Sequence, residues 1–187
     1  MTRDTQEQLL PRKGWRWVKF LAVLFACVLL LLLVRSFAVE VYKVAYQGML
    51  PTFEVGDKIF VDKVIYHLRE PERHDVIAFN SVERSTKGDR NDPVRIMRVV
   101  GLPGDEVMVR NGVLFVNDER QEEPYVNKRP PDYSSFGPIT MPEGAVFVMG
   151  DNRGDSRDSR FFGPVPFENI EGKVFLIAWP PGRIEYV

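Results

Sequence analysis

The sequence predicts a mainly β protein, in which an antiparallel sheet or barrel with a small hairpin insert follows one N-terminal transmembrane helix. Three observations favour this fold class. Many short β-like runs are separated by Pro and Gly. Asn111-Gly112 joins two of these runs, and both residues accept the positive φ of a two-residue hairpin turn. Ahead of all the runs, Phe20 to Val34 is a stretch of 15 residues without a charge.

The apolar stretch is the first element along the chain, and we expect a transmembrane signal anchor over residues 20–39. A spanning helix needs about 20 apolar residues. Extending the stretch from Trp17 to Val39 supplies that length, because Lys19 and Arg35 can reach the headgroups with their long side chains.

The charges around the anchor predict its orientation. Residues 1–19 form a tail with five basic and two acidic residues, whereas the rest of the chain has 20 basic and 24 acidic residues. The positive-inside rule places the basic tail in the cytoplasm and residues 40–187 outside. We therefore expect a single-pass type II protein of the cell membrane, with the lipid bilayer as a partner.

A cleaved signal peptide is the main alternative to an anchor. Ser36-Phe37-Ala38 is a small-x-small triplet of the kind that precedes a cleavage site. Arg35 directly before the triplet, and the long basic region in front of the apolar stretch, favour the uncleaved anchor instead. A buried helix of a soluble protein is disfavoured, because this stretch has no polar face.

After the anchor the pattern changes to short strands. We expect them at residues 39–44, 58–64, 75–79, 95–100, 106–110, 113–116, 145–149, 173–179 and 183–186. Residues 40–105 and 141–187 would form the main core, and residues 106–140 a small β-hairpin insert. Polar or Pro-rich composition predicts loops at 81–93 and 127–138.

Several classes of function are disfavoured by composition. The single Cys27 permits neither an intramolecular disulfide nor a cysteine-built metal cluster, and two histidines are too few for a mainly histidine site. We expect no metal and no cofactor. The net charge of −1 over 187 residues gives no sign of nucleic-acid binding.

Three local patterns are better explained without function. His67 and His74 have no serine or cysteine in a recognisable nucleophile setting, and we expect them on the surface. Arg153-Gly154-Asp155 matches an adhesion tripeptide, which occurs often by chance. The acidic residues of the loop after 150 alternate with arginines, which favours ion pairs over calcium.

Four blocks, in order along the chain, together resemble the type I signal peptidases, the serine/lysine-dyad S26 family. The blocks are Gly48-Met49-Leu50-Pro51-Thr52-Phe53 with Gly56-Asp57-Lys58; Arg98-Val99-Val100-Gly101-Leu102-Pro103-Gly104-Asp105; Gly150-Asp151-Asn152-Arg153 through Gly163-Pro164-Val165; and Ile170-Glu171-Gly172-Lys173 with Trp179-Pro180. The resemblance implies an anchored β-sheet protein that cuts signal peptides from exported proteins after small-x-small motifs, at the outer face of the membrane.

The same resemblance implies a mechanism, and this chain lacks both residues that perform it. In the family a serine hydroxyl attacks the scissile carbonyl, and a buried, neutral lysine acts as general base. Gly48 occupies the serine position and Met97 the lysine position. Glycine offers no nucleophile, and methionine has the length and apolar character of lysine without its nitrogen.

The residues that surround the dyad are retained. By resemblance, Ser156 is the serine beside the base, and Arg98 with Asp151, and Asp158 with Arg160, form an ion-paired frame. A second group of residues would contact the substrate: Met49, Pro51, Phe53 and Tyr46. For Met49, Pro51 and Phe53, packing in the core is an equal alternative. Tyr46 lies where some family members supply an oxyanion-hole hydroxyl.

We therefore expect a non-catalytic member of the family that binds signal peptides or preproteins, with pilins among the candidate clients because inactive relatives can act as assembly helpers. An active peptidase is the alternative, and it would need an unrecognised dyad, for example one centred on Ser156. Lys43 and Lys58 lie in neighbouring strands, but nothing in the sequence directs either to the site. A third interpretation is an inactivated variant of an active enzyme. The sequence specifies no oligomeric state.

Overall fold

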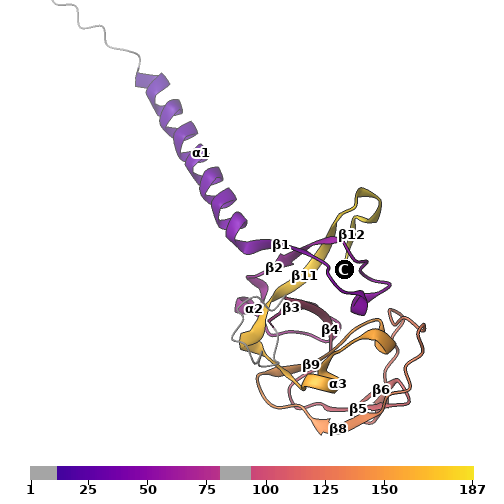
Figure 1. Cartoon of the computed structure of the whole chain (residues 1–187). Helices are drawn as coiled ribbons and strands as arrows, with labels where there is room; N and C mark the ends of the chain where they lie inside the picture. Colours follow the sequence, from indigo (N-terminus) through magenta and orange to yellow (C-terminus); the bar gives the residue numbers. More distant parts are fainter. Residues whose placement is uncertain (1–11, 81–93) are drawn as a thin grey trace, which may run out of the picture. The chain divides into compact units, whose positions relative to one another are not determined.

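The computed structural model describes residues 12–80 and 94–187 of the chain (Figure 1). The loop expected at 81–93 and most of the basic tail lie outside the described residues. The chain divides into two compact units, with the boundary after Ala38.

The first unit contains one long helix, α1 (Arg12–Ala38), which includes the apolar stretch. Within the described part of the chain, no helix combines the length and the apolarity that a membrane crossing requires. The transmembrane anchor therefore stays a prediction from the sequence.

The second unit is built on antiparallel strands, which confirms the mainly β class. Among the described residues, eight strands form the larger sheet. In spatial order they are β1 (Val39–Lys43), β2 (Lys58–Asp62), β11 (Ile170–Trp179), β3 (Val76–Phe79), β4 (Arg95–Gly101), β9 (Ala145–Met149) and β10 (Val165–Pro166), with β12 (Glu185–Tyr186) also paired to β11. Each of the nine strands expected from the sequence overlaps an observed strand of one of the two sheets.

The smaller sheet has four strands in the described residues, in the order β7 (Glu119–Arg120), β6 (Val113–Val116), β5 (Glu106–Arg110) and β8 (Phe136–Thr140). The predicted hairpin turn is confirmed, because Asn111 and Gly112 have φ values of 49° and 76° between β5 and β6. The loop expected at 127–138 was wrong at its end, since β8 begins at Phe136 and pairs with β5.

Two hydrophobic clusters hold the sheets together. In β2, Ile59 and Val61 are buried at alternate positions, as expected for a strand with one face toward a core. β9 is buried on both faces: Val146 and Val148 belong to the first cluster, while Phe147 and Met149 join residues of the smaller sheet in the second. The smaller sheet therefore packs against the face of β9 that points away from the first core.

Short helices fill the connections and bring the functional segments together. They are α2 (Ile65–Leu68), α3 (Ser159–Phe162) and the 3-10 turns η1 (Gln47–Met49), η2 (Arg153–Asp155), η3 (Phe167–Asn169) and η4 (Pro181–Arg183). η1 contacts both η2 and β4, although these three elements lie far apart in the sequence. The first three blocks of the resemblance meet at this point.

Candidate active site

Gly48 lies in η1 with its α carbon facing Ser156. A Cβ atom built on Gly48 would lie 3.6 Å from Ser156 Oγ and 3.8 Å from Asp155 O, which are ordinary van der Waals distances. The position therefore has room for a side chain and happens to carry none. Tyr46, directly before η1, is 60% exposed.

Asn152 holds η1 in place from the other side of the site. Its backbone N–H donates to the Gly48 carbonyl at 3.0 Å, and its Nδ2 donates to the Gln47 carbonyl at 3.0 Å. The side chain is 2% exposed, and its Oδ1 has no hydrogen-bond partner among the described residues. The loop after β9 thus fixes the backbone at Gly48, the position that the resemblance assigns to the nucleophile.

Ser156 has a buried hydroxyl. Its Oγ atom is inaccessible to solvent and makes no hydrogen bond within the described chain. The backbone of Gly150 approaches closely: a Cβ at Gly150 would lie 2.3 Å from both Ser156 Oγ and Gly48 O. A glycine is required there, so the chain packs tightly around an unsatisfied hydroxyl.

Met97 lies in the middle of β4, paired with Ile77 of β3. It is 8% exposed and belongs to the first hydrophobic cluster, together with Met49. At the position that the resemblance assigns to the base, the structure therefore has a buried thioether within an apolar core. A thioether sulfur is too weakly basic to accept a proton from a serine hydroxyl.

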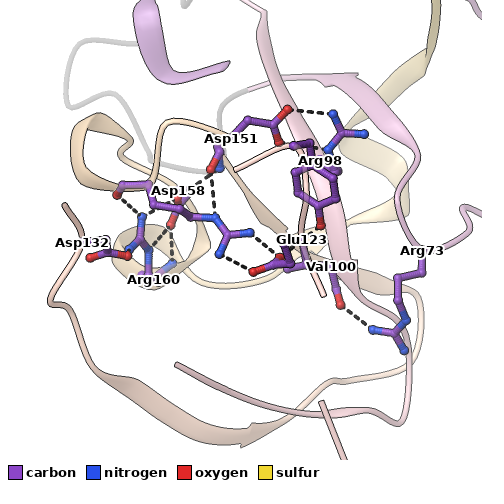
Figure 2. Close-up of polar contacts among 11 residues, drawn as sticks. Arg73, Arg98, Val100, Glu123, Asp132, Asp151, Asp158 and Arg160 are labelled. Atoms are coloured by element: carbon purple, nitrogen blue, oxygen red, sulfur yellow. Dashed lines mark hydrogen bonds and ion pairs between the residues drawn. The ribbon is translucent and has the colours of Figure 1, made fainter. Parts of the chain in front are cut away.

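Arg98, the neighbour of Met97, forms a bidentate ion pair with Asp151 (Figure 2). Arg98 Nε donates to Asp151 Oδ1 at 2.9 Å, and Nη2 donates to Oδ2 at 2.7 Å. Thr52 Oγ1, from the first block, donates to the same carboxylate. This predicted pair is present, and it joins three of the blocks at one buried carboxylate.

An aromatic ring covers the other side of Arg98. The guanidinium carbon lies 4.1 Å from the centre of the Tyr125 ring, and Nη1 donates to the His74 carbonyl at 3.2 Å. Burial raises the pKa of the Tyr125 hydroxyl, and burial together with the charge of Arg98 lowers the pKa of His74. Both His67 and His74 are exposed, as expected.

The second predicted pair, Asp158 with Arg160, is also present. Arg160 Nε donates to Asp158 Oδ1 and Nη2 donates to Oδ2, both at 2.8 Å. Asp158 Oδ2 also accepts from the Gly150 N–H at 3.2 Å. Burial lowers the pKa of Arg160, but the hydrogen bonds and the charges of Asp158 and Asp132 together outweigh this effect, so the pKa is raised.

The residues expected to contact a substrate divide into two groups. Met49 and Phe53 are 3% and 0% exposed and lie in the first hydrophobic cluster, which is the core-packing alternative. Pro51 and Tyr46 are exposed. The two lysines considered as substitutes for the base, Lys43 and Lys58, are exposed and face each other across the β1–β2 pair.

Sequence reasoning missed the residues that hold the site loop from the smaller-sheet side. Glu123 pairs with Arg153, and Asp132 pairs with Arg160. Arg153 is 3% exposed, so the Arg153-Gly154-Asp155 tripeptide is not presented for adhesion. In the sequence, Gln121, Glu122 and Glu123 look like a solvated polar run, and no local signal separates Glu123 from its neighbour Glu122.

Chemically, the position that the resemblance assigns to the nucleophile has no side-chain atom, because it is Gly48. The hydroxyl nearest to Gly48 belongs to Ser156, and the residue at the base position is apolar. Within the described residues, no cluster of three or more metal-ligating side chains is present.

Comparisons with known proteins identify the family of the chain. The family described as "Signal peptidase, peptidase S26" matches residues 15–179. The chain is 34% identical over 184 residues to "Probable signal peptidase I-2" of Synechocystis, which covers 98% of this chain and 83% of the relative. It is 39% identical over 158 residues to a signal peptidase I of Leptolyngbya laminosa, which covers 84% of this chain and 77% of the relative. A crystal structure of a signal peptidase I from Enterococcus faecalis has a TM-score of 0.45 and 34% identity, covering 56% of this chain and 97% of that one. On the family match and the two relatives, the chain belongs to the signal peptidase I family, peptidase S26.

Proposed function

We propose that this chain binds the signal peptides of exported preproteins and does not cut them. The observation that carries the proposal is that Gly48 faces a buried Ser156 hydroxyl, which has no hydrogen-bond partner among the residues that the structure describes. In an active dyad that hydroxyl would have an amine to bind. In this chain the Ser156 hydroxyl lacks that amine, as expected if the lysine of the dyad was replaced by methionine while the residues around it were kept.

The loss of the base adds to the loss of the nucleophile. Removing either member of a catalytic pair typically lowers the rate by several orders of magnitude. Met97 fills the apolar slot, and removing a buried amine also removes its desolvation cost. Function can therefore be lost while the fold is kept.

The retained frame supports binding. Arg98 with Asp151, and Asp158 with Arg160, keep their ion pairs, and Asn152 still fixes the backbone of Gly48. These contacts shape the site whether or not a peptide is cut. Binding energy that is not used to reach a transition state remains available to hold a client.

For the location we propose a single-pass anchor at residues 20–39, with residues 1–19 in the cytoplasm and residues 40–187 on the outer face. The apolar stretch and the charge difference across it support this topology. Clients would then be preproteins arriving at the outer face, with pilins as one candidate class for an assembly helper.

Two measurements on the purified full chain test the proposal. Incubation with a preprotein should give no cleaved product, while a labelled signal peptide should shift the protein's NMR signals. Cleavage by the unmodified chain would refute the non-catalytic part. The absence of any shift with a series of signal peptides would refute the binding part.

Restoring the dyad is the stronger test. Gly48→Ser with Met97→Lys should cleave the preprotein, because the side chain at 48 has room and a lysine at 97 would be buried, which lowers its pKa. The matched control is Gly48→Ala with Met97→Lys, which fills the same space without a hydroxyl and should stay inert. A folded but inactive Gly48→Ser, Met97→Lys variant would mean that the frame itself has changed.

An active peptidase remains the competing function, and the position of Ser156 is the observation that favours it. Its hydroxyl is the group closest to Gly48. If the unmodified chain cleaves a preprotein, Ser156→Ala should abolish that cleavage. Persistence of activity in this variant would exclude Ser156 as the nucleophile.

A further inference from the structure

The segment 121–135, which connects β7 to β8, lies directly against the site loop of residues 150–160. The Asn127 N–H donates to the Asp151 carbonyl at 2.7 Å. A Cβ at Gly154 would lie 2.7 Å from Pro130 O and 3.1 Å from Pro130 Cγ. The two segments are therefore in backbone contact, although about 25 residues separate them in the sequence.

Glu123 of this segment forms an ion pair with Arg153, a buried arginine of the site loop. Both carboxylate oxygens accept from Arg153, with Nη1 to Oε2 at 2.8 Å. The two side chains are 10% and 2% exposed. Arg153 in turn donates from Nε to the Gly150 carbonyl at 3.1 Å. Glu123 thus neutralises the arginine that holds Gly150, the residue packed against Gly48 and Ser156.

Asp132 makes a second, parallel connection (Figure 2). Its Oδ2 lies 2.6 Å from Arg160 Nη1, and the side chains are 10% and 4% exposed. Arg160 also donates from Nη2 to the Arg153 carbonyl at 2.8 Å and pairs with Asp158. One carboxylate of the segment therefore supports each of the two buried arginines in the loop.

Tyr125 completes the contact by linking the segment to the Arg98–Asp151 pair. Its ring lies under the Arg98 guanidinium at 4.1 Å, and its hydroxyl donates to Glu123 Oε1 at 3.1 Å. A single stretch of chain thus contacts both ion pairs of the frame.

We propose that segment 121–135 sets the geometry of the peptide-binding site, with Glu123 and Asp132 as positioning residues that act through Arg153 and Arg160. For its peptide-binding consequence, this inference rests on the proposed function. The physical reason is that a buried guanidinium without a carboxylate is strongly unfavourable, so Arg153 would turn toward solvent if Glu123 lost its charge. The Gly150 carbonyl would then lose its donor, and the backbone around Gly48 would loosen.

Glu122 offers a matched control for this idea. It adjoins Glu123, is exposed, and loses the same charge when changed to glutamine. The test compares E123Q, E122Q and the unmodified full chain in detergent micelles. Amide hydrogen exchange is followed by NMR at Gly150 and Asn152 in the site. The control amide is Val99 in β4 of the larger sheet, whose N–H donates to the Asp75 carbonyl.

In E123Q we expect exchange at Gly150 and Asn152 to rise at least tenfold while Val99 keeps its rate. E122Q should match the unmodified chain, and E123D, which restores the charge on a shorter side chain, should recover part of the protection. Unchanged site amides in E123Q would overturn the inference. So would an equal acceleration at Val99, because it would indicate a general loss of stability.

If E123Q does not fold, D132N serves as the second variant, since Arg160 keeps Asp158 when Asp132 loses its charge. Its site amides should exchange at least threefold faster, and unchanged rates would again overturn the inference. Affinity for a labelled signal peptide should fall at least fivefold in whichever variant loosens the loop. If the unmodified chain binds no peptide but the amides respond as expected, the proposed function fails and the positioning role stands.

Discussion

At the residue scale, Gly48 and Gly150 lie close together but differ in whether they leave room for a side chain. Gly48→Ala should change the free energy of unfolding by less than about 1 kcal/mol, because its Cβ would meet its neighbours at 3.6 Å or more. Gly150→Ala should cost more than about 2 kcal/mol, because its Cβ would lie 2.3 Å from a backbone oxygen. Urea denaturation of both variants measures the difference. A large loss in Gly48→Ala would mean that the space beside Ser156 is not available to a side chain.

Two serines make a second comparison, between an unsatisfied and a satisfied hydroxyl. Ser156→Ala removes a buried Oγ that has no hydrogen-bond partner in the described part of the chain, so stability should stay the same or rise by up to about 1 kcal/mol. Ser159→Ala removes the acceptor of the buried Val148 N–H at 3.0 Å and should cost about 1–3 kcal/mol. The denaturant midpoints of the two variants measure these changes in stability. Equal losses would show that Ser156 has a hydrogen-bond partner in solution.

The site residues that sequence reasoning could find are those within the four blocks. Arg98 with Asp151, and Asp158 with Arg160, were expected by resemblance, and the structure forms both pairs. Glu123 was out of reach because its partner Arg153 is 30 residues away, and a pairing over that distance leaves no periodic signal in the sequence. Nothing in a single sequence states that a given carboxylate will be buried.

At the scale of elements, Asp75 joins α2, the start of β3 and β11. It lies 2.6 Å from Lys173 Nζ and 2.9 Å from Arg69 Nη2, and it accepts from Tyr66 Oη at 3.0 Å. Burial raises the pKa of Asp75, but hydrogen bonds from Lys173, from the Glu72 backbone and from Arg69 outweigh it, so the pKa is lowered. A carboxylate with a lowered folded-state pKa stabilises the fold above its unfolded pKa, and this contribution is lost as the pH falls through the folded value.

We therefore expect Asp75→Asn to lower stability by about 1–3 kcal/mol at pH 7. The gap between the variant and the unmodified chain should shrink as the pH falls below about 4, the ordinary unfolded-state value. Glu72→Gln is the control, because this carboxylate is 69% exposed and its ion pair with Arg69 is long at 3.7 Å, so little should change. Thermal unfolding across pH measures both variants. A gap that stays constant down to pH 2 would contradict a linkage to Asp75 ionisation.

The strands show which elements a sequence can predict. Asn111-Gly112 was decisive for β5 and β6 because a two-residue turn requires positive φ at both positions. β8 was missed since Gly137 and Pro138 normally interrupt a strand. The structure tolerates them because β8 is at the edge of the smaller sheet and pairs on one side, with β5 only among the described strands. Whether a strand is at an edge depends on tertiary pairing, which local sequence does not encode.

At the scale of the whole molecule, the near-neutral net charge conceals a basic tail and an acidic remainder, and the structure has its unit boundary after Ala38. Among the residues whose burial the structure describes, the members of both hydrophobic clusters lie beyond that boundary. The second unit thus contains its own cores and the complete candidate site. Its stability should not depend on the helix that precedes it.

Removing residues 1–38 tests both this independence and the proposed anchor. A chain that begins at Val39 keeps β1 and its pairing with β2, so it should fold with the β-type circular dichroism and the unfolding temperature of the second unit in the full chain. The full chain, expressed in cells, should stay with the membrane fraction after an alkaline carbonate wash, because a spanning helix resists it, while the shortened chain should be released. Release of the full chain would contradict the anchor. Failure of the shortened chain to fold would instead show that residues before Val39 contribute to the second unit, contrary to the location of both clusters.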